Sequence, residues 1–364
     1  ASRSPSSPDP LASEGWMLRV SKLPGPLLTR AWDRGLVDVD RRADVVHALS
    51  LAAPPARHRP LVVTVHDLAF RRVPEAFPER GRRWHEAALS RAIDRARHLV
   101  VPSSVVADDL MAAGARARSV VVIEHGSDHL PPPDLQSTEA LLGRVGVTGP
   151  FALAVGTVEP RKNLIRLVEA HRRASASLPE PLALVVVGPV GWGPLDLPHD
   201  DLGSPAAGRA PRLGDRRGEK VAAPAPGAAP GVGARSSEGL RDQMSRADQV
   251  QVVSTGPVAP AVLAGLYRRA RLVAYVPLAE GWGLPPIEAM AAGTPVLASP
   301  VPSTGGAAWE VDPTDIEAMA AGLVTVATDE VVRAELVAAG WGRAALRTWR
   351  ASAEEHLALW RSVS

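Results

Sequence analysis

Residues 280–290 read Glu-Gly-Trp-Gly-Leu-Pro-Pro-Ile-Glu-Ala-Met and directly follow the apolar run at residues 272–276. The expected order is a strand, a glycine-containing turn and a helix that begins with proline, with Glu288 in its first turn and Gly293 ending it. The start of such a helix presents free N–H groups and the positive end of the helix dipole, which suits a diphosphate. The stretch therefore predicts an anion site at the carboxyl end of a strand.

Short β-branched runs alternate with helical patterns through most of the chain, which is typical of a parallel sheet in an α/β fold. Leu89, Ile93 and Ala96 recur at helical spacing and predict a helix that covers one face of the first sheet. The expected strands are 45–47, 61–65, 98–101, 120–123, 151–155, 182–187, 250–253, 272–276 and 295–298. Further helices are expected at 104–110, 163–174 and 260–270, and around 331–339 and 353–360.

The length of 364 residues suits two α/β domains better than one hydrophobic core. We expect a first domain at residues 1–145 and a second at residues 146–345. Between about 194 and 248 the second domain loses its aliphatic periodicity in favour of Pro, Ala, Gly and Arg, which indicates a disordered insertion or a sequence artefact. Residues 346–364 are expected to form a helix that docks on the first domain through Leu357 and Trp360.

The composition is that of a packed protein, with 46% hydrophobic and 22% charged residues and a formal net charge of +2. The excess of arginine forms no basic tract, so no nucleic-acid partner is expected. The absence of cysteine excludes disulfides, thiolate metal sites and a cysteine nucleophile, and it fits a reducing cytoplasm. No run of about 18 apolar residues predicts a membrane span.

Two carboxylates, Glu280 and Glu288, are separated by seven residues and can accept hydroxyl hydrogen bonds at two points of one ligand. Gly281 and Gly283 let the backbone approach that ligand closely. A helix-capping role would account for Glu288, but it leaves Glu280 and both glycines unexplained.

A second strand, turn and helix start lies at residues 155–163, Val-Gly-Thr-Val-Glu-Pro-Arg-Lys-Asn. Arg161 would offer a forked guanidinium to phosphate oxygens and Lys162 a point charge. The alternative is a solvated basic turn. A third segment, Thr-Val-His-Asp-Leu at 64–68, ends a strand where ligands of open α/β sheets bind, and a satisfied buried histidine is the alternative for His66.

These segments resemble the retaining glycosyltransferases of family 4 (glycosyl transferases group 1), in which two glutamates with this spacing mark the donor site. The Leu-Pro-Pro at 284–286 and the Ala-Gly-Thr-Pro-Val at 292–296 match as well. The resemblance covers about residues 45–193 and 250–364 and implies the GT-B fold, two Rossmann-like, doubly wound α/β domains facing across a cleft. It implies transfer of a hexose with retention, from a nucleotide sugar to a glycan or lipid-linked acceptor of a cell-envelope polysaccharide.

The resemblance also implies roles for single residues. His66 and Glu280 would lie at the transferred sugar as the catalytic pair, Glu288 would bind the ribose, and Lys162 would grip the diphosphate. The implied donor-binding set is Gly156, Arg161, Lys162, Gly281, Trp282, Gly283, Leu284 and Glu288. No metal or further cofactor is expected, because the cations neutralise the diphosphate. The forms of the two segments look like mannosyltransferases and favour GDP-mannose, with a UDP-sugar as the alternative.

Some positions depart from the family pattern. Thr157 stands where some relatives carry arginine, and Glu124 and His125 replace a small polar pair before Gly126, which matches a structural turn. Nothing before Trp16 matches the strand and Gly-rich loop with which the family opens, so the first domain is expected to lack both. A truncated or non-catalytic nucleotide-sugar-binding protein and a sugar-nucleotide epimerase of the same fold are the alternatives.

Two other patterns lie outside these segments. The Asp-Val-Asp at 38–40 has no strand before it and is interpreted as a solvated loop rather than a metal site. An arginine cluster near the cleft is suited to an anionic acceptor or a lipid phosphate, with a solvated helix face as the alternative; it comprises Arg71, Arg72, Arg80, Arg82 and Arg83. We therefore expect a cytoplasmic protein with peripheral contact at the inner face of the membrane.

Overall fold

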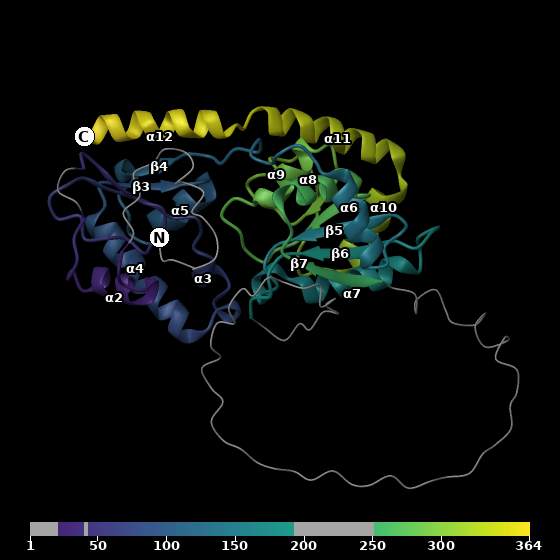
Figure 1. Ribbon diagram of the computed structural model, residues 1–364, viewed down its shortest axis with the longest axis horizontal. Coiled ribbons are helices and arrows are strands. Elements are labelled where there is room, and N and C mark those ends of the chain that lie inside the picture. Colours follow the sequence, from purple (N-terminus) through teal and green to yellow (C-terminus); the bar gives the residue numbers. More distant parts are fainter. Residues whose placement is uncertain (1–20, 40–42, 193–250) are drawn as a thin grey trace, which may run out of the picture.

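The computed structural model describes residues 21–39, 43–192 and 251–364 and contains two separate parallel sheets (Figure 1). The first sheet has the strand order β1-β2-β3-β4, and the second has the order β10-β9-β8-β5-β6-β7. Every strand pairing in both sheets is parallel. The prediction of two Rossmann-like α/β halves is confirmed.

The first domain combines short valine-rich strands with helices on one face of its sheet. Its strands are β1 (Val46–Ala48), β2 (Leu61–Thr64), β3 (His98–Val101) and β4 (Val120–Val122). Its helices are α2 (Gly25–Asp33), α3 (Ala69–Arg72), α4 (Glu79–Arg95) and α5 (Ser104–Ala112), with the 3-10 turns η1 (Pro74–Ala76) and η2 (Ala117–Ser119). Helices α4 and α5 cover the face that carries Leu61, Val63 and Leu99.

The second domain has a larger sheet with helices on both faces. Its strands are β5 (Phe151–Val155), β6 (Ala183–Val187), β7 (Val252–Gly256), β8 (Leu272–Tyr275), β9 (Val296–Ala298) and β10 (Trp309–Glu310). Its helices are α6 (Leu135–Arg144), α7 (Leu164–Ser175), α8 (Pro260–Arg269), α9 (Leu284–Ala291), α10 (Ile316–Thr328) and α11 (Glu330–Ala345), with the 3-10 turn η3 (Pro160–Lys162).

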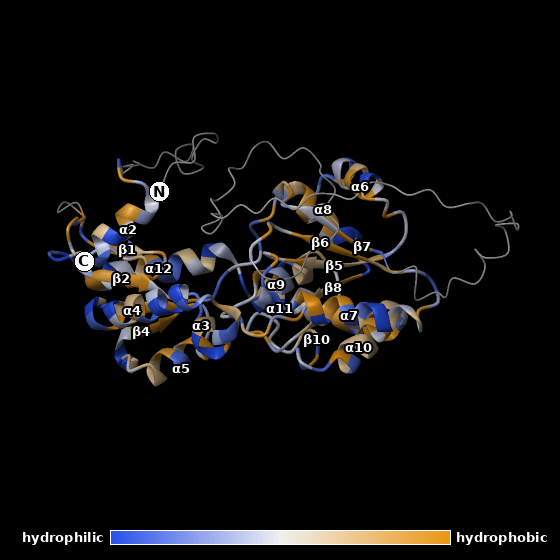
Figure 2. Ribbon diagram, turned by 90° about the horizontal axis from the view of Figure 1, so that it is seen from below, coloured by the Kyte–Doolittle hydropathy of each residue, from blue (hydrophilic) through white to orange (hydrophobic). Residues whose placement is uncertain are grey.

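Alternation along the strands divides the second core into two layers. Leu184 and Val186 of β6 pack with α7 and α10 on one face. Val185 and Val187 face the other way, toward α6, α8 and α9. Figure 2 shows the second sheet between α6 and α8 on one side and α7 and α10 on the other. Because both faces are covered, the strands are apolar throughout rather than alternating.

The strand order of the second sheet reverses between β5 and β8. From β5 the chain proceeds outward through β6 and β7, whereas from β8 it proceeds the other way through β9 and β10. Loops that leave neighbouring strands in opposite directions open a crevice at the carboxyl ends, and ligands of open α/β sheets bind there. The two loops at this reversal are residues 156–163 and 276–283, which are the segments singled out from the sequence.

The last helix returns to the first domain. Helix α12 (Trp349–Val363) follows α11 and lies along the first sheet (Figure 1). Leu359, Trp360 and Val363 pack on Val62 and on other residues of the face that α4 and α5 leave open. The expected docking through Trp360 is confirmed.

The docking expected of Leu357 is wrong, because its side chain is 41% exposed. The inward stripe of α12 comprises the buried residues Ser352 and Leu359 and the half-buried residues His356, Trp360 and Val363. Leu357 lies off that stripe. Because Ser352 and His356 are polar, the stripe is not recognisable as an apolar pattern in the sequence.

The segment between the domains contains a helix that packs on the second sheet. Leu141 and Leu142 of α6, with Val145, join the core beside α8, although the sequence assigned residues up to 145 to the first domain. Residues 193–250, which include the expected insertion at about 194–248, and residues 1–20 lie outside the described residues. Among the helices that are described, none has the length and apolarity required to cross a bilayer.

Candidate functional site

The two loops at the strand-order reversal are locked together by Asn163. This residue adopts a left-handed backbone with φ 59°, and its amide donates to the carbonyl oxygens of Val276 (3.1 Å) and Pro313 (2.7 Å). Asparagine is one of the few non-glycine residues that adopt this conformation readily. The loop after β5 is thus fixed directly against the end of β8.

Glycines make the crevice narrow. A Cβ on Gly188, at the end of β6, would lie 2.1 Å from the carbonyl oxygen of Gly156. At Gly156 itself the backbone has φ +150°, and an added Cβ would lie 3.4 Å from Cε of Lys162. The Lys162 side chain therefore passes directly over Gly156, the first residue of the predicted donor-binding set.

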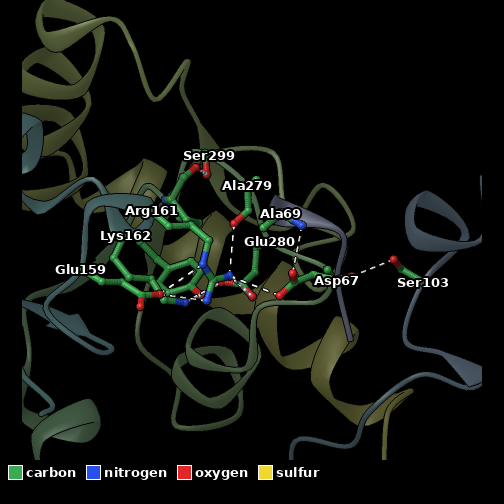
Figure 3. Close-up of polar contacts among 12 residues, drawn as sticks. Asp67, Ala69, Ser103, Glu159, Arg161, Lys162, Ala279, Glu280 and Ser299 are labelled. Atoms are coloured by element: carbon green, nitrogen blue, oxygen red, sulfur yellow. Dashed lines mark hydrogen bonds and ion pairs between the residues drawn. The ribbon is translucent and has the colours of Figure 1, made fainter. Parts of the chain in front are cut away.

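Glu280 lies between two cations (Figure 3). Its Oε2 is 2.5 Å from Lys162 Nζ, and its Oε1 is 3.2 Å from Arg161 Nη1. Arg161 also pairs with Glu159 (3.0 Å) and, across the domain boundary, with Asp67 (3.5 Å). The predicted residues Arg161, Lys162 and Glu280 are thus brought together at the end of β8.

The charges in this cluster set the protonation state of Glu280. Burial by itself raises the pKa of Glu280, but the charges of Lys162 and Arg161 outweigh burial and leave that pKa below its usual value. Glu280 is therefore ionised at neutral pH, and its two cations are partly neutralised by it.

Glu288 lies in a separate pocket of hydrogen-bond donors. The hydroxyl of Tyr267 in α8 donates to its Oε2 (2.6 Å), and Nε2 of His129 lies 3.0 Å from its Oε1. Glu288 is the fifth residue of α9, so the expectation that it lies in the first helical turn is wrong. Its carboxylate is held by α8 and by the segment between the domains instead of capping its own helix.

Each of the two glutamates, Glu280 and Glu288, accepts a hydrogen bond from a tyrosine hydroxyl. The whole chain contains two tyrosines. Tyr275 donates to Glu280 Oε2 at 2.7 Å, and Tyr267 donates to Glu288 as described above. Burial, reinforced by the neighbouring carboxylate, raises the pKa of both phenols well above the usual value. Both tyrosines therefore remain protonated donors, which keeps each carboxylate in one orientation.

The start of α9 lies beside these carboxylates. Gly283 precedes the helix with φ +93°, and no side chain in the described part of the chain caps it. Pro285 and Pro286 have no N–H, so Gly283 and Leu284 supply the amide donors at this end. Leu284 itself packs on the second core. The predicted helix start is present, with fewer free donors than a helix without prolines would have.

The two domains touch at Gly281. The hydroxyl of Ser103 donates to the carbonyl oxygen of Gly281 at 2.7 Å, and a Cβ on Gly281 would lie 1.8 Å from the carbonyl oxygen of His66. The His66 ring is exposed, and its Nε2 lies 2.8 Å from the carbonyl oxygen of Leu49. The alternative of a buried histidine is therefore wrong for His66.

Trp282 is buried beneath this contact. Its indole is 3% exposed, and the guanidinium of Arg343 lies 5.6 Å from the ring centroid. Its Nε1 has no hydrogen-bond partner among the residues that the structure describes. His125, which the sequence marked as a family departure, meets the Trp282 ring edge-on at 6.3 Å and stacks on Trp349 at 5.4 Å. Burial, then His66 and His356, lowers the pKa of His125 to about 4.

The other two patterns form local contacts in the described parts of the chain. Arg71 and Arg72 of the arginine cluster form ion pairs with Glu86 and Asp109. Asp38 accepts from the backbone N–H of Val39, whereas position 40 lies outside the described residues. No group of acidic or histidine side chains with metal-binding geometry occurs among the residues described.

Sequence reasoning missed Asp67, Glu159, His129 and the two tyrosines as partners of the predicted residues. Asp67 and Glu159 were quoted within the segments that carry His66 and Arg161, so a count of nearby carboxylates would have indicated them. The scarcity of tyrosine was a second available signal. No comparable sequence signal marks His129, because its partner Glu288 is more than 150 residues away in the sequence.

Two facing parallel sheets with a charged crevice between them define the GT-B class of glycosyltransferases, and comparison with known proteins agrees. Residues 4–129 match the family described as "Glycosyltransferase Family 4", and residues 231–329 match "Glycosyl transferases group 1". Both matches extend beyond the residues in which the resemblance was seen, one starting upstream and the other inside the segment at 194–248. In both halves the chain therefore resembles the family 4 (group 1) glycosyltransferases.

Relatives and solved structures resemble the chain at low identity. The "O-antigen chain mannosyltransferase B" of Escherichia coli is 25% identical over 302 residues, which is 81% of this chain and 68% of that protein. The "Serotype-specific mannosyltransferase WbdA" of Escherichia coli is 26% identical over 225 residues, 61% of this chain and 22% of that protein. The structure of HepE of Anabaena with UDP and glucose has a TM-score of 0.63 at 20% identity, covering 93% and 82% of the two chains.

Proposed function

We propose that the chain transfers a hexose from a nucleotide diphosphate sugar to a glycan or lipid-linked acceptor, with retention at the anomeric carbon. The observation that carries the proposal is the cluster of Lys162, Arg161 and Glu280 at the strand-order reversal, beside the start of α9. In the reaction the bond between the anomeric carbon and the diphosphate oxygen breaks. The acceptor oxygen forms the new bond on the same face, and its proton passes to the departing phosphate.

The cluster matches the electrostatic need of that step. Charge develops on the leaving diphosphate, and stabilisation by groups that are already oriented is the main contribution a protein makes to such a transfer. Lys162 and Arg161 are held in place by Glu280, Glu159 and Asp67 before any ligand arrives. An incoming diphosphate competes with Glu280 for the two cations, which frees that carboxylate to accept from hydroxyls of the transferred sugar.

The second pocket is suited to the nucleotide. Glu288 has two of its lone pairs engaged by Tyr267 and His129, and a carboxylate has about four acceptor positions. The remaining positions fit the vicinal hydroxyls of a ribose. GDP-mannose is our first choice of donor, because the relatives described above are named mannosyltransferases. The expected cytoplasmic location and membrane contact stay predictions.

Donor binding is the first test. We would titrate GDP-mannose, UDP-glucose and UDP-N-acetylglucosamine by calorimetry into the wild type, Lys162→Ala and Glu288→Ala. Lys22→Ala and Glu355→Ala are matched controls, since both side chains are exposed and lie outside the site. We expect one donor to bind, both site variants to lose at least about tenfold in affinity and both controls to bind normally. Binding of no donor to the wild type would refute the proposal.

Transfer itself is tested with the donor that binds. Radiolabelled sugar would be offered with glycan and lipid-linked acceptors, and the anomeric configuration of the product would be read by NMR. Retention supports the proposal, and inversion refutes the mechanism. Consumption of donor without any acceptor would favour the epimerase alternative, whereas binding without turnover would favour a non-catalytic binding protein.

A further inference from the structure

His129 connects the second pocket to the helix that spans the domains. It lies in the segment between the domains, and its Nε2 is 3.0 Å from Glu288 Oε1. Its other ring nitrogen, Nδ1, accepts a hydrogen bond of 3.0 Å from Nε1 of Trp349, the first residue of α12. The two rings meet edge-on, at 5.8 Å and 88°.

The indole partner determines the tautomer of His129. A tryptophan N–H can only donate, so Nδ1 must be the unprotonated nitrogen of the ring. In the neutral imidazole the proton then lies on Nε2, which is the nitrogen beside Glu288. Glu288, first through its hydrogen bond and then through its charge, raises the pKa of His129. Trp349 opposes protonation, because a second N–H at Nδ1 would face the indole N–H.

Trp349 is itself held from three sides. Its backbone N–H donates to Asp128 Oδ1 at 2.7 Å, and its indole stacks on His125 at 5.4 Å with an interplanar angle of 20°. A Cβ on Gly126 would lie 2.1 Å from the backbone nitrogen of Trp349. The start of α12 is therefore packed against the backbone of residues 126–129, and the indole has little freedom to leave His129.

We propose that His129 is a positioning residue for the donor nucleotide: with its tautomer fixed by Trp349, it orients Glu288 to accept from the ribose hydroxyls. This inference rests on the proposed function and adds residues that neither carboxylate segment contains. His129 fixes one carboxylate oxygen and Tyr267 the other, so the carboxylate plane is determined before the nucleotide binds. Preorganised acceptors improve affinity because the cost of ordering them is met during folding.

Two amide variants separate the functions of the two ring nitrogens. His129→Gln can place an amide nitrogen where Nε2 lies and so donate to Glu288. His129→Asn can place an amide oxygen where Nδ1 lies and so accept from Trp349, but it is too short to reach Glu288. Trp349→Phe removes the indole N–H together with part of the ring system, and it retains a ring that can stack on His125. All three variants keep a polar or aromatic side chain of similar size, which favours folding.

The readout is discrimination between ribose and deoxyribose. Binding of GDP and UDP would be measured by calorimetry and compared with their 2′-deoxy and 3′-deoxy forms. We expect the wild type to bind GDP or UDP more tightly than the deoxy forms of the same nucleotide. His129→Asn should lose roughly tenfold in affinity for that ribonucleotide and should bind its deoxy forms as the wild type does. His129→Gln should restore the preference, and Trp349→Phe should show an intermediate loss.

Coupling to Glu288 is tested by a double-mutant cycle. If His129 acts through Glu288, the pair His129→Asn and Glu288→Gln should lose no more affinity than Glu288→Gln alone. Additive losses would overturn the inference, and so would an unchanged ribose preference in His129→Asn. Both outcomes leave the proposed function intact, provided that the wild type binds. A wild type that binds neither GDP nor UDP would refute the proposed function itself.

Discussion

A Cβ on Gly281 would lie 1.8 Å from the carbonyl oxygen of His66. This contact joins the loop at residues 276–283, which carries Glu280, to the end of β2. The two domains therefore meet where the transferred sugar is proposed to lie. Any side chain at position 281 must separate them.

Gly281→Ala is therefore expected to impair transfer much more than donor binding. The proposed nucleotide contacts come from outside the first sheet, whereas transfer needs both domains in place, and a displacement of about 1 Å can cost on the order of 100-fold in rate. Gly342→Ala is the control, because a Cβ there would meet no atom of the described residues within 4 Å. We would compare kcat with the affinity for GDP. An unchanged kcat would show that the domains do not need this contact.

Glu280→Gln should uncouple affinity from turnover. The substitution removes the negative charge that partly neutralises Lys162 and Arg161, so free nucleoside diphosphate should bind more tightly than to the wild type, and the gain should shrink with added salt. Turnover should fall at least about tenfold, since the sugar loses its charged acceptor. Calorimetry with GDP and initial rates measure the two effects. The exposed Glu317→Gln is the matched control, and weaker GDP binding in Glu280→Gln would contradict the competition between Glu280 and the diphosphate.

Acid should destabilise the first domain through His47. Burial, followed by the charges of His356 and His66, lowers the pKa of His47 to about 4 in the folded protein, below its unfolded value of 6.5. The folded state therefore favours the neutral ring. Its contribution to stability is complete above about pH 6.5 and is lost as the pH falls toward about 4.

The measurement is the free energy of unfolding at about pH 7 and about pH 4.5. His47→Gln should lose less stability between these two pH values than the wild type does. His58→Gln, which removes an exposed histidine, should follow the wild type. Equal losses in His47→Gln and the wild type would show that His47 is not the group responsible.

Two leucines of α12 offer a matched pair for the docking of the last helix. Leu359 is 9% exposed and packs on Val62 and Val100, whereas Leu357 is 41% exposed. Leu359→Ala should lower the free energy of unfolding by about 2–3 kcal/mol and Leu357→Ala by less than about 1 kcal/mol. Denaturant unfolding measures both. A larger loss of stability in Leu357→Ala than in Leu359→Ala would support the docking through Leu357 that the sequence suggested. It would refute the observed orientation of α12 on the first sheet.

Much of the fold followed from local sequence. Runs such as Leu61–Thr64 and Phe151–Val155 are apolar because both faces of their sheets are covered, and their length separates them from helices. Helix α5 is preceded by the N-cap residue Ser103, whose hydroxyl accepts from the backbone N–H of Val106, as its residue type suggests. These features depend on neighbours within one element, and such neighbours are visible in the sequence.

The site was predictable in its charged residues and its glycines. The segments with Lys162 and Glu280 indicated an anion site, and the structure brings those side chains together. Contacts such as Asp67 with Arg161, or His129 with Glu288, join positions far apart in the chain and depend on how the domains pack. The register of α12 was missed for a related reason: Ser352 and His356 face inward only because the first sheet lies beneath them.

The placement of α12 has a consequence for synthesis on the ribosome. Trp360 contacts His47, 313 residues away in the sequence, and the helix covers a face formed by Val62, Val100 and Ile123. That apolar face leaves the ribosome early and stays exposed to water while the entire second domain is translated. The first domain is synthesised first, but its core is completed only when α12 docks. Before α12 docks, the nascent chain exposes an apolar surface suited to binding a chaperone.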